Sequence, residues 1–143
     1  MTGTSSRAQK DRRPPLSRSP RILVLDDDPL IRLWLRQSLA ELGFRVFEAE
    51  DENAAFATLA DGQSLPEIVL LDHPLAGVKD FALLRRLLKR APKMRVIVMS
   101  ADHAANTAAN ALAAGSAAVI NKPFEIKDLV ALLDRDVPPP PVG

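Results

Sequence analysis

The chain has 143 residues, of which 47% are hydrophobic and 26% charged, a composition typical of a soluble globular domain with a single core. It contains no cysteine, which excludes a disulfide framework and thiolate chemistry, and no apolar run reaches the roughly 18 residues of a membrane span. The net charge of +1 is uneven: six basic residues and one acid lie within residues 1–21, giving +5 there and −4 in the remainder. We therefore expect a disordered basic tail at residues 1–20 and a Pro-rich tail at 136–143, in a cytoplasmic chain without nucleic-acid binding or membrane insertion.

Between these tails, segments with strand and helix patterns alternate along residues 21–135. The expected strands cover residues 21–26, 44–49, 67–72, 95–100 and 117–120. The expected helices cover residues 30–42, 51–60, 80–90, 102–115 and 124–135. Asp28 and Pro29 supply an N-cap and a first helical residue, and Gly43 a helix stop. Strands alternating with helices through short connections predict an α/β fold with a doubly wound, five-stranded parallel sheet.

Polar residues follow the carboxyl ends of these strands, where such sheets bind ligands. Asp26 and Asp27 end the first strand, Asp72 the third and Ser100 the fourth, while Lys122 follows the fifth by two residues. Three converging carboxylates raise each other's pKa unless a cation compensates, and an oxygen-only ligand set favours Mg²⁺. Carboxylates, a hydroxyl and an ammonium group are the parts needed to neutralise a transferring phosphoryl group, and a carboxylate can itself be the nucleophile.

Five sequence motifs, in order, carry a resemblance to a known family. They are "LVLDDDPLIR", "GFRVFEAEDENAAF", "IVLLD", "VIVMSA" and "GSAAVINKPF". Together they resemble the receiver domain of bacterial two-component response regulators, of the stand-alone type, over residues 21–135. The resemblance implies a flavodoxin-like (βα)5 fold with strand order 2-1-3-4-5. It also implies a protein that is no enzyme toward other substrates and catalyses only its own aspartate phosphorylation and dephosphorylation.

The resemblance assigns the metal-binding roles position by position. Asp72 corresponds to the phospho-accepting aspartate, Asp27 to the direct Mg²⁺ ligand, and Asp26 to the acid that reaches the ion mainly through water. Pro74 falls where the family uses a backbone carbonyl as metal ligand, a role that proline can still fill because it retains its C=O.

Two further positions correspond to groups that bind the phosphoryl oxygens. Ser100 occupies the position of the family's serine or threonine, and Lys122 that of its lysine, whose bond to the following Pro123 is typically cis.

Four positions depart from the family's pattern or invite an added role. Ala76 replaces a usual proline, which we expect to loosen the loop after Asp72. Asp80 replaces a usual glycine and is interpreted as a helix cap, and His73 is expected to point away from the site. Val119 occupies the switch position, where the family commonly has an aromatic residue, so the usual coupling of hydroxyl and ring cannot operate in its standard form.

The helix expected at 30–42 carries more apolar residues than the core requires. Ile31, Leu35 and Leu42 share the predicted core stripe. Leu30, Leu33 and Trp34 lie beside or opposite it, and form a possible partner face; alternatively, Trp34 packs against the last helix. The resemblance implies a histidine kinase or histidine phosphotransfer protein and a downstream target protein as partners, with a homodimer possible and no attached DNA-binding domain expected.

Two other functions stay open at this point. The departures at Ala76, Asp80 and Val119 would suit a phosphorylation-independent interaction or adaptor module. A Mg²⁺-dependent phosphohydrolase of the haloacid dehalogenase type would place its nucleophile on the first strand, but "DDDPL" matches only the first and third positions of its motif.

Overall fold

The computed structural model describes residues 19–60, 62 and 65–136, so the two predicted tails lie outside the described residues except for Ser19, Pro20 and Asp136. The strands are β1 (Arg21–Leu25), β2 (Arg45–Ala49), β3 (Ile68–His73), β4 (Arg95–Ser100) and β5 (Ala118–Asn121). The helices are α2 (Pro29–Glu41), α3 (Glu52–Leu59), α4 (Ala82–Arg90), α5 (Ala105–Ala113) and α6 (Ile126–Asp136). None of the described helices is long and apolar enough to cross a membrane.

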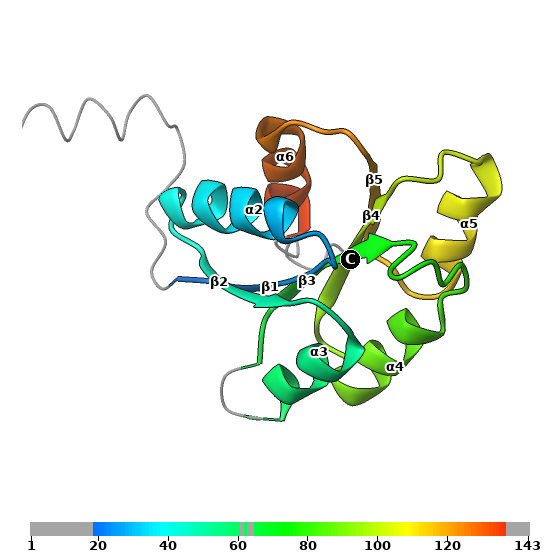
Figure 1. Cartoon of the computed structure of the whole chain (residues 1–143), viewed down its shortest axis with the longest axis horizontal. Coiled ribbons are helices and arrows are strands. Elements are labelled where there is room, and N and C mark those ends of the chain that lie inside the picture. Colours follow the sequence, from blue (N-terminus) through cyan, green and yellow to red (C-terminus); the bar gives the residue numbers. More distant parts are fainter. Residues whose placement is uncertain (1–18, 61, 63–64, 137–143) are drawn as a thin grey trace, which may run out of the picture.

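The five strands form one parallel sheet in the order β2-β1-β3-β4-β5, which confirms the predicted fold class and strand order. Helices α2 and α6 cover one face of this sheet, and α3, α4 and α5 cover the other (Figure 1). Strands β1, β3 and β4 are buried almost throughout, as their uninterrupted apolar sequences require of a sheet covered on both faces.

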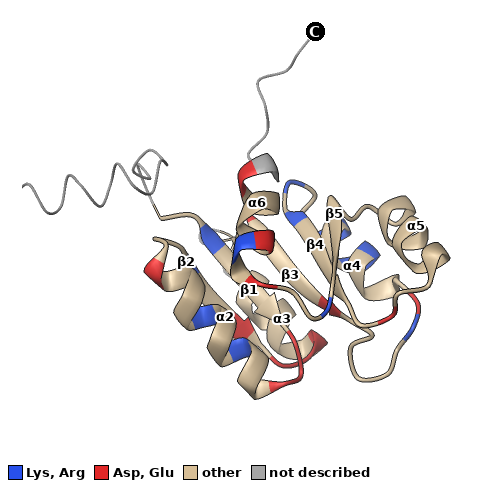
Figure 2. Cartoon of the chain, turned by 90° about the horizontal axis from the view of Figure 1, so that it is seen from above, with Lys and Arg blue, Asp and Glu red and all other residues tan. Residues whose placement is uncertain are grey.

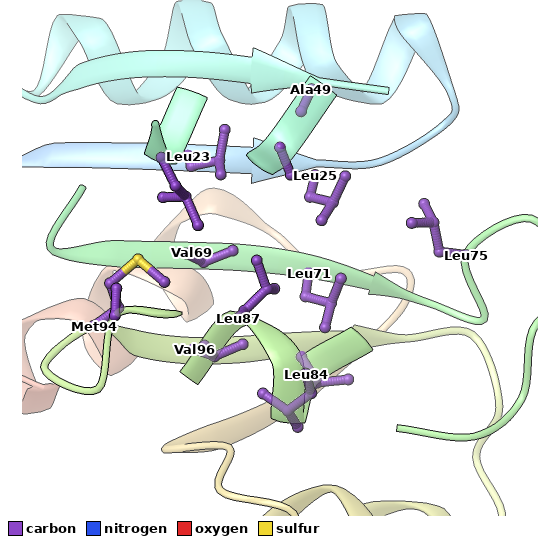
Figure 3. Close-up of a cluster of buried hydrophobic side chains, with 14 of the residues drawn as sticks. Leu23, Leu25, Ala49, Val69, Leu71, Leu75, Leu84, Leu87, Met94 and Val96 are labelled. Carbon is purple, nitrogen blue, oxygen red and sulfur yellow. The ribbon is translucent and has the colours of Figure 1, made fainter. Parts of the chain in front are cut away.

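Alternating side chains of the central strands divide the core into two clusters. Leu23, Leu25, Val69 and Leu71 point toward α3 and α4, where they pack with residues such as Leu84 (Figure 3). The intervening residues, among them Ile22, Val24 and Leu70, pack against α2 and α6 on the opposite face. Because all five strands are parallel, their carboxyl ends, and the polar residues found there, lie at the same edge of the sheet.

The ends of α2 follow the predicted chemistry. The carboxylate of Asp28 accepts a hydrogen bond of 2.9 Å from the amide of Leu30, and Pro29 is the first helical residue. Gly43 ends the segment with a φ of 99°, a left-handed conformation that favours glycine. Leu35 is fully buried as predicted, but so is Leu39, whereas Ile31 and Leu42 are only half-buried. The core stripe therefore runs through Leu35 and Leu39 rather than ending on Leu42.

Candidate functional site: an acidic cluster at the carboxyl edge of the sheet

The three predicted acids come together where β1 and β3 end. Carboxylate oxygens of Asp26, Asp27 and Asp72 lie within 4.8 Å of one another. Asp26 and Asp72 are buried and Asp27 is exposed. Figure 2 shows acidic residues in the loops that follow β1 and β3. The parallel pairing of β1 and β3 thus produces an acidic cluster that is open to solvent on the Asp27 side and could hold a divalent ion.

Lys122 reaches this cluster from the loop after β5. Its ammonium Nζ lies 2.6 Å from Oδ1 of Asp72 and 3.3 Å from Oδ2 of Asp26. Burial raises the pKa of Asp72 from 3.8 to about 6, an effect that the charge of Asp26 reinforces and the hydrogen bond from Lys122 only partly offsets. Burial by itself lowers the pKa of Lys122, but the bond to Asp72 and the two negative charges outweigh it and leave that pKa raised. Three carboxylates and one ammonium meet here, so the cluster is short of positive charge even with Lys122 in place.

The β1 end of the site is fixed by contacts to the main chain. Oδ1 of Asp26 accepts a 2.9 Å hydrogen bond from the amide of Asp28, and the guanidinium of Arg32 donates one of 2.7 Å to the carbonyl oxygen of Asp26. Arg32 is itself paired with Glu48 at 3.2 Å. Because Asp28 caps α2, only Asp26 and Asp27 of the three consecutive acids belong to the cluster, as predicted. The role of Arg32 was not predicted.

Ser100 lies on β4 directly beside β3, where it pairs in register with His73. Its buried hydroxyl is already engaged within its own loop, because Oγ donates to the carbonyl of Asp102 at 2.6 Å and accepts from the amide of Asp102 at 3.1 Å. The structure therefore places Ser100 at the predicted edge, with its hydroxyl directed to the β4–α5 loop.

The β4–α5 loop also contacts Lys122, through the side chain of His103. Nε2 of His103 lies 2.7 Å from the carbonyl oxygen of Lys122, and the amide of Lys122 donates to the carbonyl of Ser100 at 2.8 Å. The Lys122–Pro123 peptide bond is cis, as the resemblance implied. His103 was not predicted, because a histidine that binds a distant backbone carbonyl leaves no spacing pattern in the sequence.

The structure just after Asp72 contradicts the expectation for Ala76 and agrees with those for Asp80 and His73. Val78 donates from its amide to the carbonyl of Leu75 at 3.0 Å, and the two residues between them, Ala76 and Gly77, have φ values of 54° and 79°. Two positive φ angles are typical of a tight type I′ turn. The prediction that Ala76 loosens this loop was wrong: the turn is closed, and proline, fixed near −65°, could not adopt the conformation of Ala76.

Asp80 and His73 behave as expected. The carboxylate of Asp80 accepts a hydrogen bond of 3.0 Å from the amide of Ala82, the first residue of α4. Asp80 therefore caps the helix, although Phe81 occupies the position directly before α4. The His73 ring is buried and stacked on Phe81, with ring centroids 4.3 Å apart, and this burial lowers its pKa. Between them, Pro74 follows His73 through a cis peptide bond, and the metal-binding role of its carbonyl stays a prediction.

A cavity of about 260 Å³ adjoins the site on the α3 and α4 side. Apolar residues of β3 and the following loop form much of its lining, together with the stacked His73 and Phe81. Asp72 is one of its wall residues, so the cavity opens next to the acidic cluster.

The predicted switch position lies within the sheet and carries no aromatic ring. Val119 on β5 is half-buried, pairs with Val98 and packs against the core cluster on the α3, α4 and α5 side, without a ring to rotate.

The predicted partner face on α2 is partly exposed: Leu30 is 73% exposed and Leu33 and Trp34 are near 40%. The Trp34 ring also contacts the Phe124 ring just before α6, with centroids 5.7 Å apart. Trp34 therefore combines both interpretations, since it packs beside α6 and stays partly exposed.

Comparison with known proteins gives a consistent result. A profile of the response regulator receiver domain matches residues 22–134. The transcriptional regulator NtrC of Azospirillum brasilense is 36% identical over 114 residues, covering 80% of this chain and 23% of that protein. NtrC of Salmonella typhimurium is 34% identical over 116 residues, covering 81% and 24%. The chain thus spans about a quarter of the length of these curated relatives.

Solved structures share the fold. A CheY-like receiver domain protein from Methanospirillum hungatei JF-1 superposes with a TM-score of 0.74 at 26% identity, covering 82% of this chain and 92% of that one. A response regulator from Thermotoga maritima has a TM-score of 0.74 at 27% identity, with coverages of 82% and 96%.

Proposed function

Because this chain belongs to the response regulator receiver domain family, we propose that its carboxylate Asp72 accepts a phosphoryl group from a phosphohistidine of a kinase or phosphotransfer protein. The observation that carries the proposal is the contact of 2.6 Å between Asp72 and the ammonium of Lys122, beside the two acids that end β1. This is a nucleophile placed between a cation and a potential metal site at the open edge of the sheet.

The transfer is a substitution at phosphorus. One oxygen of ionised Asp72 forms the new bond to phosphorus, and the bond from phosphorus to the donor breaks, its electron pair leaving with the donor. With acetyl phosphate as donor the leaving group is acetate, so the carboxylate and the acyl phosphate need no proton for their charges to balance. Lys122 moves its ammonium from the carboxylate to an oxygen of the transferred group.

The chemistry of the ligand set fits Mg²⁺ as the cofactor. Carboxylate and carbonyl oxygens are the ligands that Mg²⁺ prefers, and the carboxylate oxygens of Asp26, Asp27 and Asp72 lie within 4.8 Å of one another. The three carboxylates of the cluster face the single ammonium of Lys122, and a divalent ion would relieve this deficit of positive charge. Asp26, Asp27, Asp72 and the carbonyl of Pro74 would hold it, and the ion would supply charge neutralisation for the phosphoryl oxygens.

Ser100 takes part only after a change in its hydrogen bonds. Its hydroxyl donates to Asp102 in the structure described, so binding a phosphoryl oxygen on Asp72 requires that bond to break. Since Val119 offers no ring, we propose that the β4–α5 loop itself carries the output of this change to a target protein.

The apolar face of Leu30, Leu33 and Trp34 is our candidate for docking the phosphohistidine protein. It lies on α2, the helix that begins directly after the acidic residues that follow β1, so a partner bound there approaches the phosphorylation edge. We propose that this domain signals by contact with other proteins and does not turn over external phosphate esters. The cytoplasmic location and a homodimer stay predictions.

Incubation with acetyl phosphate and Mg²⁺, followed by intact-mass measurement, tests the proposal. The expected result is one added phosphoryl group on the wild type and none on Asp72→Asn. A folded wild type that gains no phosphoryl group would favour the phosphorylation-independent adaptor instead. Sustained hydrolysis of an unrelated phosphomonoester would favour the phosphohydrolase.

A further inference from the structure

The peptide groups on both sides of the Lys122 α-carbon are anchored. On the N-terminal side its amide donates to the carbonyl of Ser100 at 2.8 Å, which extends the β4–β5 pairing by one bond. On the C-terminal side its carbonyl accepts from Nε2 of His103 at 2.7 Å. The first of these bonds belongs to the sheet, but the second depends on a single side chain.

The bond fixes which nitrogen of His103 carries a proton. A carbonyl oxygen can only accept, so Nε2 must be the donor. The contact therefore needs a hydrogen on Nε2, which the Nε2–H tautomer of the ring supplies.

His103 lies on the loop that also holds Ser100. Asp102, the residue before it, exchanges two hydrogen bonds with Ser100 and uses its carboxylate to accept from the amide of Ala104 and the hydroxyl of Thr107 at the start of α5. Before phosphorylation the loop is thus tied to β4 at one end and to α5 at the other, which positions the ring of His103.

From these contacts we propose that His103 is a positioning residue for the phosphoryl-transfer step. By holding the Lys122 carbonyl, His103 fixes the backbone from which the lysine side chain extends, and the ammonium of this side chain must follow the phosphoryl group. This inference rests on the proposed phosphorylation of Asp72. Lysine has four rotatable side-chain bonds, and a fixed main chain restricts where its ammonium can move. When the ammonium leaves the carboxylate for a phosphoryl oxygen, the anchored backbone confines the adjustment to the side chain.

The same link joins the two groups expected to bind phosphoryl oxygens. Ser100 ends β4 and Lys122 directly follows β5, and His103 connects the loop after Ser100 to the carbonyl of Lys122. A change in the hydrogen bonds of Ser100 is then transmitted to the Lys122 peptide, a coupling that does not use the valine at position 119.

The experiment compares four proteins: wild type, His103→Leu, His103→Gln and the control Asn106→Leu, which changes an exposed residue on the first turn of α5. The rate of phosphorylation by acetyl phosphate is measured by intact mass at saturating Mg²⁺, and the affinity for Mg²⁺ alone is measured separately by calorimetry. Leucine removes the donor at similar volume, whereas the amide of glutamine can donate to the same carbonyl.

We expect His103→Leu to be phosphorylated about three- to ten-fold more slowly, the size expected from losing one hydrogen bond. His103→Gln should recover at least half of the wild-type rate, and the Mg²⁺ affinity should stay within two-fold of wild type in every variant. A general folding defect would instead lower the rate and the affinity together, and glutamine would not rescue it.

The outcomes separate this inference from the function on which it rests. A wild type that gains no phosphoryl group overturns both. Normal phosphorylation of wild type and His103→Leu alike overturns only the positioning role. The positioning role also fails if His103→Gln is as slow as His103→Leu, or if His103→Leu loses its affinity for Mg²⁺.

Discussion

Replacing Asp72 by asparagine should stabilise the protein when no divalent ion is present. The pKa of Asp72 is raised from 3.8 to about 6 because burial and the charge of Asp26 disfavour its ionised form. At about 1.36 kcal/mol per pKa unit, the ionised carboxylate costs the fold up to about 3 kcal/mol near neutral pH. Asparagine keeps the shape without the charge, and Asp26 still pairs with Lys122. Allowing for the lost Asp72–Lys122 contact, we expect a gain of about 1–3 kcal/mol in the free energy of unfolding.

The sign of the effect with pH provides a sharper test. Since the pKa of Asp72 is higher in the folded state, between about pH 4 and pH 6 the folded protein binds a proton that the unfolded chain has released. The stability that this proton contributes is fully present below pH 4 and is lost as the pH rises through 6. The advantage of Asp72→Asn should therefore be small near pH 4, grow up to about pH 6 and stay constant above it.

Urea denaturation followed by circular dichroism measures both effects. The series runs at about pH 4.5, 6 and 7.5, where the other carboxylates are common to both proteins and cancel in the comparison. Glu41→Gln, an exposed carboxylate outside the site, is the matched control and should stay within about 0.5 kcal/mol of wild type. Adding Mg²⁺ should stabilise the wild type more than the variant. An Asp72→Asn protein no more stable than wild type at neutral pH, or an advantage that ignores pH, would refute the reasoning.

Substitutions at four further positions have defined outcomes. Ala76→Gly should raise the free energy of unfolding by about 1 kcal/mol in urea titrations, because glycine adopts the positive φ without a steric cost; Ala76→Pro should lower it. Gly115→Ala should cost more than about 1 kcal/mol, since φ is 114° and the new Cβ would meet Leu88 at 2.6 Å. Arg32→Leu should weaken Mg²⁺ binding about ten-fold in calorimetry, with Arg32→Lys between the two. Leu30→Glu should slow transfer from a phosphohistidine protein but not from acetyl phosphate; equal slowing with both donors would contradict the docking role.

The parts of the site that could be predicted from the sequence depend on the periodicity of the strands. Buried strands in parallel order bring their carboxyl ends to one edge, so the convergence of Asp26, Asp27 and Asp72 follows once the strands are located. The cap at Asp28 was equally accessible, because an acid before Pro at the start of an apolar repeat is a local signal. Leu39 was missed although its spacing of four from Leu35 is helical, so that signal was present.

The remaining contacts could not be found in this way, because they join side chains to backbone atoms far along the chain. Arg32 binds the carbonyl of Asp26 and His103 that of Lys122, and neither contact constrains the type of residue at the accepting position. Ala76 shows a different limit. Its conformation depends on the pairing of Leu75 with Val78 across the turn, whereas comparison with a family pattern considers the missing proline alone.

The contact between Trp34 and Phe124 gives the protein an intrinsic fluorescence probe beside the loop that carries Lys122. Trp34 is the only tryptophan of the chain, and its ring lies 5.7 Å from a phenylalanine two residues after Lys122. Its emission therefore comes from a single known location beside the loop that carries the lysine. Because Trp34 is 37% exposed, its emission wavelength should also respond to a partner that covers α2. Rearrangement of the lysine loop and docking of a donor can thus be followed in real time, without a label, in the unmodified protein.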